Sequence, residues 1–551
     1  MVSEIKLLEA EWTYNGEDLN NYMKQLAIKN PNITGITLDL SNSKFNTQTS
    51  YYSIKIPNNI VEFTLIGKNT DNTINYIYAS LVAEGGGETY FNCKVINLGL
   101  SANNPDNDTN GVFIDIASDI LQNKSTEKGN TLQFSGNNSI VASRTGNYPE
   151  AKINAAIHIG EGQRLSIYFE DDNTKLECIG FVSNYDSAAG IGGNSNESAG
   201  NIIMYTAGTI NISGGYRGAG IGGGSNGSGG KIQINGIGIV TVTGGINAAG
   251  IGGGFYGASG NITINTFANM QVIGGNGAAG IGSGYNGAVE SIVIDAMNIL
   301  DVQGGDGGAG IGSGSEGSPG FIKINVGWQL IATGGINASG IGGGFNVSGG
   351  YITVSGTGEL MATGGINGAG IGGGINGAVG TIEITGELDV GVKGGLNTSA
   401  IGAGYKGGVG EIKLIGSGEI SCTRGEISVD DIGSGSTQII SKDRIIIYPV
   451  VILTPGVAKP LVKKVQFKKE DGTTYIGKFI VRLKGEDEFR QFISATDKLG
   501  YSWIYADNAI SYISTPDGNF IARNVDLANI GDDIILYSNI KFRGINIFGK
   551  V

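Results

Sequence analysis

The segment Gly218-Ala219-Gly220-Ile221-Gly222-Gly223-Gly224 decides the fold, because close copies of it recur along the chain. Each copy lies thirty residues after the previous one, without insertion or deletion. A constant period of this length indicates a repeat architecture, in which each unit packs against its neighbours. The central isoleucine of the segment recurs at Ile191, Ile221, Ile251, Ile281, Ile311, Ile341, Ile371 and Ile401.

Two alternating apolar pairs follow the segment in each unit. Examples are Ile232-Gln233-Ile234 and Val240-Thr241-Val242, and a Gly244-Gly245 step closes the unit. Alternation with a period of two predicts β-strands whose apolar side chains point to one side. Three short strands per unit, separated by glycine-rich corners, describe one coil of a solenoid. The sequence therefore predicts an all-β, single-chain parallel β-helix (β-solenoid) with 30-residue coils and a stacked isoleucine ladder.

Changes in composition and spacing divide the chain into four parts. Residues 1–60 are expected to form an N-terminal cap and attachment segment with one helix, and residues 61–187 to form irregular coils. The regular repeats occupy residues 188–441. Beyond them glycine falls while charged and aromatic residues increase, so residues 442–551 are predicted to be a separate β-rich, sandwich-like domain.

The N-terminal helix has its own start and stop signals. Asn15 or Gly16 can cap it, Glu17 and Asp18 fall in its first turn, and Pro31 ends it. A helix at this place would cover the open end of the solenoid and keep its strand edges from pairing with other chains. The sequence thus predicts a capped rod.

Composition excludes several classes of function. The chain has 551 residues, of which 98 are glycine, and a formal net charge of -13, which argues against a nucleic-acid partner. Its three cysteines are widely scattered and its one histidine, His158, lies in a strand-like run, so neither a disulfide framework nor a multi-histidine metal site is expected. Membrane insertion is not expected either, and the N-terminus lacks the pattern of a secretory signal, which predicts synthesis in the cytoplasm.

Acidic residues of the repeat do not form the aligned carboxylate pair that a polysaccharide-cleaving enzyme needs. Asp295 instead shares a column with Asn235, Asn265 and Asn325, which predicts a side-chain ladder from coil to coil. The glycine-rich runs also lack the lysine of a phosphate loop and the aspartates of a calcium-binding repeat. No catalytic residue, cofactor or metal is therefore assigned.

The variable loop after each glycine-rich segment carries an aromatic column. Phe255, Tyr285, Phe345 and Tyr405 occupy one equivalent position, and Tyr256 is next to the first of them. Aromatic faces are suited to binding, so this column is a candidate groove for an extended glycan. The alternative interpretation is that the rings shelter the backbone of the corner.

Two further features lie in the C-terminal part. Tyr501, Trp503 and Tyr505 alternate onto one face of a predicted strand, as either a core face or a recognition face. Residues 463–469 alternate lysines with apolar residues, which is typical of an edge strand protected by charge; binding to an acidic wall polymer is the other interpretation.

The units at residues 218–224 and 368–374, with their following Gly-x-Ile-x-Ile and Gly-Gly motifs, resemble the glycine-rich β-helical repeats of surface and phage-associated proteins of Gram-positive bacteria. The resemblance covers residues 188–424. It implies a rod of the tail-fibre or receptor-binding type, made in the cytoplasm and acting outside the cell on a virion or tail-like particle.

Three functions follow as expectations. The first is a non-enzymatic receptor-binding or tail-fibre protein of a phage or a phage tail-like particle (bacteriocin). It would bind a bacterial surface glycan or protein and contact the baseplate or another tail protein through its N-terminal region. The second is a surface adhesin with a carbohydrate-binding β-helix, and the third is a polysaccharide-degrading enzyme. Either a monomer or a homotrimer is compatible with the sequence.

Overall fold

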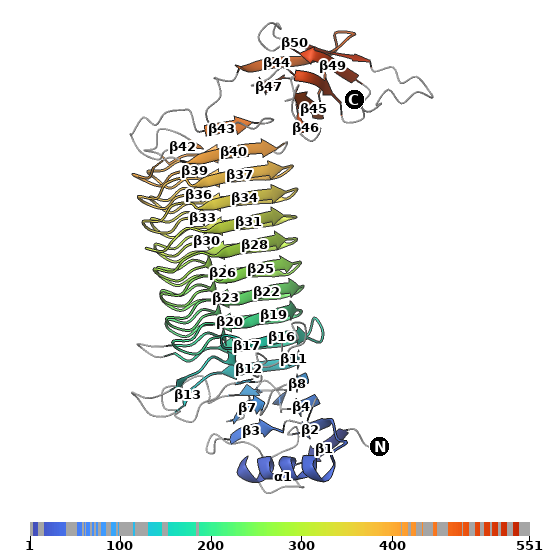
Figure 1. Cartoon of the computed structure of the whole chain (residues 1–551), viewed down its shortest axis with the longest axis vertical. Coiled ribbons are helices and arrows are strands. Elements are labelled where there is room, and N and C mark those ends of the chain that lie inside the picture. The colour runs from blue at the N-terminus through green and yellow to red at the C-terminus, as the bar shows by residue number, and fades with distance from the viewer. Residues whose placement is uncertain are drawn as a thin grey trace, which may run out of the picture.

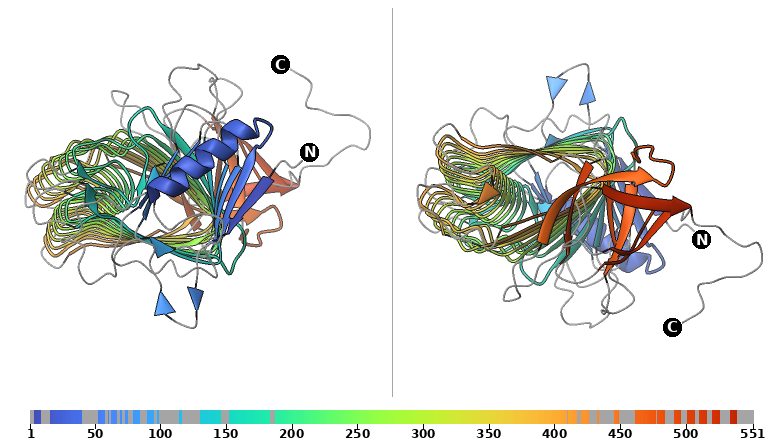
Figure 2. Two further views of the ribbon diagram at one scale, coloured as in Figure 1. Left: turned by 90° about the horizontal axis from the view of Figure 1, so that it is seen from below. Right: turned by 90° about the horizontal axis from the view of Figure 1, so that it is seen from above.

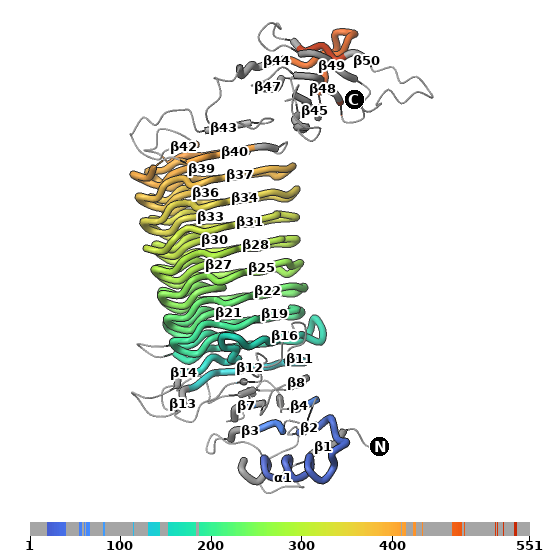
Figure 3. The backbone as a smooth tube through the Cα atoms, viewed as in Figure 1, coloured from blue at the N-terminus to red at the C-terminus, as the bar shows by residue number. Residues whose placement is uncertain are grey.

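A computed structural model gives the architecture of the chain (Figure 3). The structure describes residues 4–8, 16–39, 52–57, 60, 62–66, 69–70, 73–74, 79–83, 90–94, 97–98, 114–115, 130–145, 152–182, 187–408, 410–416, 420–425, 432–433, 445–448, 461–476, 478–483, 491–495, 501–506, 510–515, 520–525 and 533–538.

The regular coils confirm the predicted parallel β-solenoid. In one coil, the strands are β24 (Ile251–Gly252), β25 (Asn261–Thr266) and β26 (Asn269–Ile273). Residues 253–260, called turn 1 below, join the first two strands, and residues 274–280, called turn 2, lead into the next coil. Seen along the axis, the coils superimpose on one another (Figure 2).

Equivalent strands of successive coils pair in parallel and build three long sheets from the described residues (Figure 1). Sheet A contains, in spatial order, β1 (Glu4–Leu8), β2 (Gly35–Asp39), β4 (Glu62–Ile66), β8 (Tyr90–Lys94), β11 (Asn130–Ser135), β16 (Arg164–Phe169), β19 (Asn201–Thr206), β22 (Lys231–Gly236), β25, β28 (Ser291–Ala296), β31 (Phe321–Val326), β34 (Tyr351–Gly356), β37 (Thr381–Gly386), β40 (Glu411–Gly416) and β43 (Ile445–Tyr448).

Sheets B and C are made of shorter strands. Sheet B contains β3 (Tyr52–Ile56), β7 (Ala79–Ala83), β10 (Ile114–Asp115), β15 (Ile157–His158), β18 (Ile191–Gly192), β21 (Ile221–Gly222), β24, β27 (Ile281–Gly282), β30 (Ile311–Gly312), β33 (Ile341–Gly342), β36 (Ile371–Gly372), β39 (Ile401–Gly402) and β42 (Ile432–Gly433). Sheet C contains β9 (Asn97–Leu98), β12 (Asn137–Val141), β17 (Lys175–Ile179), β20 (Thr209–Ser213), β23 (Ile239–Thr243), β26, β29 (Ile299–Gln303), β32 (Gln329–Thr333), β35 (Glu359–Thr363), β38 (Asp389–Lys393) and β41 (Ile420–Thr423).

The repeated isoleucines form a dry column along sheet B. Ile221 pairs with Ile251, and Ile251 pairs with Ile281, in a register that has no shift. Every isoleucine of the column from Ile191 to Ile401 is fully buried. Because each strand has a two-residue side-chain period, one inserted residue would turn a coil's apolar side chains outward, which explains the constant spacing.

The glycine after each isoleucine permits the close stacking of the coils. At Gly252 φ is +130°, and a β-carbon built there would lie 2.0 Å from the carbonyl oxygen of Gly282 in the next coil. A side chain at this position would meet both a forbidden backbone conformation and a backbone collision. This geometry explains why Ile-Gly is repeated as a unit.

Helix α1 (Gly16–Lys29) lies at the N-terminal end of the solenoid (Figure 1). It begins at one of the two predicted capping residues and ends before Pro31. Leu19 and Met23 are buried in the same hydrophobic core as the coils. Strands β1, β2 and β3 also belong to the solenoid sheets, so sheets A and B already begin within residues 1–60.

The other end of the solenoid extends past the boundary predicted at residue 442. Strand β43 pairs with β40, so it continues sheet A instead of starting the C-terminal domain. Within the described residues β43 is the last strand of sheet A, and it lies beyond the point at which the glycine content falls.

Residues 461–538 contain a mixed sheet of their own. Strand β50 (Asp533–Ser538) pairs with β49 (Phe520–Val525) at one end and with β44 (Leu461–Lys469) at the other. Phe467 of β44 stacks against Phe479 of β45 (Lys478–Leu483), with ring centroids 4.2 Å apart. The basic strand β44 lies between β50 and β47 in the sheet, but the described pairings divide it: residues 461–466 pair with β47 and residues 466–469 pair with β50. Most of its residues therefore have a strand partner on one side, and the interpretation as a strand protected by charge stays a prediction. The order of the described strands is β46 (Gln491–Ala495), β45 (Lys478–Leu483), β48 (Ile510–Ser514), β49 (Phe520–Val525), β50 (Asp533–Ser538), β44 (Leu461–Lys469) and β47 (Tyr501–Ala506).

Candidate functional site

The predicted aromatic column lies on turn 1, where it is hydrogen-bonded to the turn 2 that leads into the preceding coil. The backbone N–H of Phe255 donates to the carbonyl of Arg217 at 3.0 Å, and that of Tyr285 donates to the carbonyl of Asn247 at the same distance. Phe345 and Tyr405 make the same type of bond, and all four rings are half-buried. The column therefore presents aromatic edges from a backbone that is held on both sides.

The structure brings Phe255, Tyr256 and Tyr285 together, and we call these three residues the aromatic platform. The Phe255 and Tyr285 rings come from neighbouring coils and stack with centroids 6.0 Å apart. Tyr256 lies against Phe255, with centroids 3.9 Å apart, and meets Tyr285 edge-on at 5.9 Å. Phe345 and Tyr405 do not join the platform, because Ser315 interrupts the column after Tyr285 and is buried.

A cation lies on the platform. The guanidinium carbon of Arg217, in turn 2, is 4.4 Å from the centre of the Phe255 ring and 6.0 Å from the centre of the Tyr216 ring. A guanidinium over an aromatic face is attracted to the negative face of the ring, which holds its planar fork in one orientation. The platform thus combines apolar faces with an oriented positive charge.

Tyr256 occupies a backbone position that takes asparagine in most of the other regular coils, with Glu316 and Lys406 as the exceptions. Its φ is +58°, in the left-handed region, and its side chain is 51% exposed. Asparagine adopts this conformation readily, whereas a bulky aromatic residue does so at an energetic cost. The equivalent residues with positive φ in other coils include Asn196, Asn226, Asn286, Asn346 and Asn376. A strained and exposed aromatic residue is a feature of binding surfaces.

The asparagines of the two turns form side-chain ladders that the sequence analysis did not identify. In turn 1, Asn376 donates to Asn346 at 2.7 Å, and Asn346 donates to Glu316 at 2.8 Å. In turn 2, Asn397 donates to Asn367 at 2.6 Å, and Asn367 in turn donates to Asn337 of the preceding coil. The signal for these ladders was available as an asparagine recurring at a fixed place in the repeat.

The polar column of sheet A, which was predicted to form a side-chain ladder, has the predicted register. Side-chain hydrogen bonds between coils join some of its members. Asn235, Asn265, Asp295 and Asn325 are successive strand partners. Asn325 donates to Asp295 at 2.5 Å, whereas Asn235 accepts from Gln233 within its own strand. Asp295 therefore has a structural hydrogen-bond partner in the next coil.

Other exposed aromatic residues lie on sheet A and its corner with sheet C. Tyr351 is 65% exposed and Phe321, its strand partner, is 42% exposed. Phe267 and Trp328, at the corner, are also exposed. Sequence reasoning missed these rings because they fall outside the loop it examined, although their outward positions follow from the strand alternation.

For the aromatic triplet of the C-terminal part, the structure describes the backbone. Tyr501, Trp503 and Tyr505 lie in β47, opposite Gln466, Lys464 and Val462 of β44. Their side chains lie outside the described residues, so the choice between a core face and a recognition face stays open.

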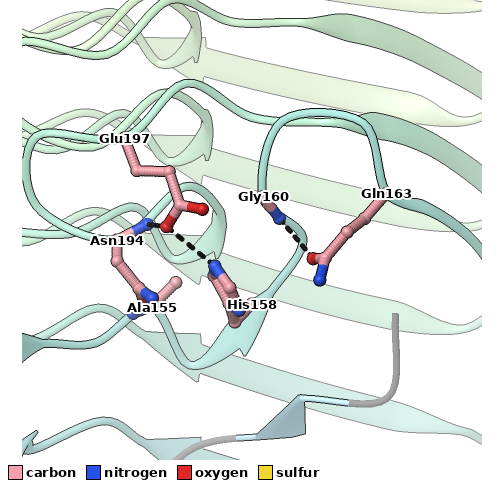
Figure 4. Close-up of polar contacts among 6 residues, drawn as sticks. All are labelled: Ala155, His158, Gly160, Gln163, Asn194 and Glu197. Atoms are coloured by element: carbon pink, nitrogen blue, oxygen red, sulfur yellow. Dashed lines mark hydrogen bonds and ion pairs between the residues drawn. The ribbon is translucent and has the colours of Figure 1, made fainter. Parts of the chain in front are cut away.

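The single histidine belongs to a polar contact between two coils (Figure 4). His158 Nε2 lies 2.8 Å from Glu197 Oε2, and the same carboxylate oxygen accepts from the Asn194 backbone N–H at 3.3 Å. His158 is 6% exposed and is the strand partner of Gly192. This contact ties the last irregular coil to the first regular one, which agrees with a structural role for the histidine.

Cys178 is fully buried in sheet C. Burial raises the pKa of its thiol well above the ordinary value, and the nearby Glu177 carboxylate raises it further. A protonated, buried thiol is a poor nucleophile and a poor metal ligand. Cys422 is half-buried.

Clusters of three or more potential metal ligands do not occur within the described ranges. In the same part of the chain, no helix has both the length and the apolar character needed to cross a bilayer. No protein-family model matches the sequence, and no match was found among curated proteins or solved structures.

Proposed function

We propose that this chain is a non-enzymatic recognition protein of the receptor-binding or tail-fibre type, acting on bacterial cells as part of a phage or phage tail-like particle. Its ligand is a bacterial surface glycan, bound by the aromatic platform and Arg217. The observation that carries the proposal is the guanidinium of Arg217, 4.4 Å from Phe255, beside the exposed ring of Tyr256.

The chemistry of the platform fits a sugar that carries an acidic group. A pyranose ring has an apolar face of C–H groups that packs on an aromatic ring and a rim of hydroxyls that stays in water. Arg217 adds a planar donor fork that can hold a carboxylate or phosphate through two parallel hydrogen bonds. An acidic glycan therefore matches both halves of the site.

The solenoid supports recognition by fixing the site before the ligand arrives. Tyr256 N–H donates to the Tyr285 carbonyl at 3.1 Å, and Phe255 N–H donates to the Arg217 carbonyl at 3.0 Å. The residues of the site are thus joined to one another through the backbone. A preformed site loses less conformational entropy on binding, which favours affinity for a weakly held ligand such as a sugar.

Binding to purified polysaccharides tests the glycan assignment. The full chain is immobilised, and a panel of bacterial wall polymers that includes teichoic acid, teichuronic acid and neutral polysaccharides is passed over it. We expect an acidic polymer to bind and the double variant Tyr256→Ala/Tyr285→Ala to weaken that binding at least 10-fold. The variant Arg217→Gln should weaken it and reduce its dependence on salt.

Phe267→Ala is the matched control, because it removes a ring that is 61% exposed at a different corner. This control should bind as the unaltered chain does. Equal binding by the platform variant and the unaltered chain would remove the platform from the proposal. The polymers should also be recovered without new reducing ends or unsaturated sugars, and their release would contradict a non-enzymatic role.

The particle assignment is tested separately. An antibody against residues 442–551 is applied to particles released from the producing cells and viewed by electron microscopy. We expect labelled tips or fibres, since the N-terminal region is proposed to attach the protein to the particle. Labelling of intact cell walls alone would contradict this part of the proposal and leave the glycan assignment standing.

A further inference from the structure

A shallow groove lies between turn 1 and sheet A in the second half of the regular repeats. It has a volume of about 350 Å³ and spans four successive coils, from Pro319 to Gly410. Pockets of roughly 300–1,000 Å³ are typical of small-ligand sites. The groove is separate from the aromatic platform, which lies one coil and more toward the N-terminus.

The floor of the groove is backbone. Gly350, Gly380 and Gly410 stand one above another, and a β-carbon at Gly380 would lie 2.2 Å from the Gly350 carbonyl oxygen. A β-carbon at Gly410 would likewise lie 1.9 Å from the Gly380 oxygen. These collisions with the neighbouring coil explain why glycine is needed there. The three glycines contribute only backbone to the floor, over about 10 Å along the solenoid axis at ~4.8 Å per coil.

The walls combine an aromatic ring with small polar and apolar groups. Tyr351 is 65% exposed and borders the groove, while Ser348 and Thr381 contribute hydroxyls. Pro319 and Ala378 contribute apolar surface. Rings and hydroxyls side by side are the combination that binds the apolar face and the hydroxyl rim of a sugar.

The described lining of the groove gives an acidic ligand no positively charged partner. The lining side chains are all uncharged, as far as the described residues go. Glu411, the strand partner of Thr381, stands at the C-terminal end of the groove, and its carboxylate is paired with Lys413 at 2.8 Å. Because this carboxylate is paired with a lysine, it adds little net charge at the end of the groove, and a neutral sugar needs no charged partner there. The groove therefore differs in charge from the Arg217 site.

We infer that this groove binds a neutral oligosaccharide, laid along the solenoid axis with one sugar ring against Tyr351. The open backbone floor sets the direction of the chain, and the hydroxyls of Ser348 and Thr381 provide hydrogen bonds to its rim. The inference goes beyond the proposed function, because the site and the charge of its ligand are different and neither site needs the other.

The test uses the full chain and three neutral tetrasaccharides: the β-1,4-linked tetramer of N-acetylglucosamine, cellotetraose and maltotetraose. Saturation-transfer NMR reports contact, and calorimetry reports affinity. We expect at least one tetramer to bind. Tyr351→Ala should weaken the affinity for that tetramer at least 10-fold, and Tyr351→Phe should change the affinity less than 3-fold. Trigalacturonate, the anionic probe, should not bind at the groove.

The variants are chosen so that folding is not the cause of any loss. Tyr351 points outward from its strand, so Tyr351→Ala should unfold at nearly the temperature of the unaltered chain. Phe267→Ala and Tyr256→Ala/Tyr285→Ala should both retain binding of the neutral tetramer, which separates this groove from the platform. Failure of all three tetramers to bind, or binding that Tyr351→Ala leaves unchanged, would overturn the inference. The inference would also be overturned if the chain dimerised and Tyr351→Ala abolished the dimer, because a second copy of the chain would then occupy the groove.

Discussion

Gly252 and Gly282 are so close that a β-carbon added to the first would lie 2.0 Å from the carbonyl oxygen of the second. They are strand partners in neighbouring coils of sheet B, and both have positive φ values. The two backbones are therefore packed so closely that no side chain fits between them, and this contact sets the spacing of the coils. The stability of the rod should therefore depend on these glycines as strongly as on its apolar core.

Gly252→Ala should lower the free energy of unfolding by about 3 kcal/mol or more, because it adds left-handed strain of about 1–3 kcal/mol to a backbone collision. Gly391→Ala is the control: Gly391 lies on the outer face of β38, and its added β-carbon would have its nearest neighbour at 3.8 Å. That change should be neutral or stabilise by up to about 1 kcal/mol. Urea unfolding measures both, and equal midpoints would contradict the stacking argument.

Ile281→Ala should destabilise the solenoid by about 2–5 kcal/mol, since it removes a fully buried side chain from the isoleucine column and leaves a cavity. The matched change Ile239→Ala removes the same atoms from a side chain that is 54% exposed and should cost less than about 1 kcal/mol. Thermal unfolding compares the two. A similar loss at both positions would mean that the column is not the core.

Asn346→Ala should cost about 1–2 kcal/mol, because it removes two ladder bonds and places alanine at a φ of +60°. Asn346→Gly removes the same bonds but accepts that φ, so it should cost clearly less. The difference between the two unfolding free energies measures the backbone contribution. If Asn346→Gly lowered the free energy of unfolding as much as Asn346→Ala does, the lost side-chain bonds would account for the whole effect.

Tyr256→Asn should separate stability from binding. Asparagine suits the φ of +58° and can join the ladder beside Asn226, so the free energy of unfolding should rise by up to about 1 kcal/mol. Loss of the exposed ring should at the same time weaken the binding of the acidic polymer several-fold. Calorimetric unfolding and the polysaccharide assay together check this, and a drop in both quantities would contradict the role of strain at this residue.

Cys178 should resist alkylation by iodoacetamide at pH 8 for as long as the solenoid stays folded, because burial keeps its thiol protonated. Its pKa is raised in the folded state, so the unfolded state loses the proton first as pH rises. The contribution of this thiol to stability is therefore complete below the unfolded pKa of ~8.5 and declines above it. Rapid alkylation without unfolding, followed by mass spectrometry, would contradict the buried position.

Much of the fold was predictable from particular residues. The thirty-residue interval between Ile221 and Ile251 predicted the coil, and the alternation in residues 232–234 predicted a strand with one buried face, because both features are local and repeat without a break. The end of sheet A at β43 was not predictable, since residues 445–448 lack the repeat pattern and pair through contacts distant in sequence.

The candidate site was predictable only as a column. The repeat placed Phe255 and Tyr285 at equivalent positions, but it did not pair Arg217 with them, because Arg217 and Phe255 lie 38 residues apart and their turns meet only after the chain has folded. The groove beside Tyr351 was missed for a similar reason. Its floor is made of glycines, which in the sequence look like any other glycine of the repeat.

The coil length, the parallel stacking and the identity of the inward-facing residues can all be read from the amino-acid sequence, because a strict period leaves one register in which apolar side chains meet. Which outward-facing groups become neighbours depends on the folded arrangement of the coils. Each turn contacts a turn some thirty residues or more away, so the meeting of a guanidinium with a ring, or of an open glycine floor with Tyr351, depends on how the coils are offset in space.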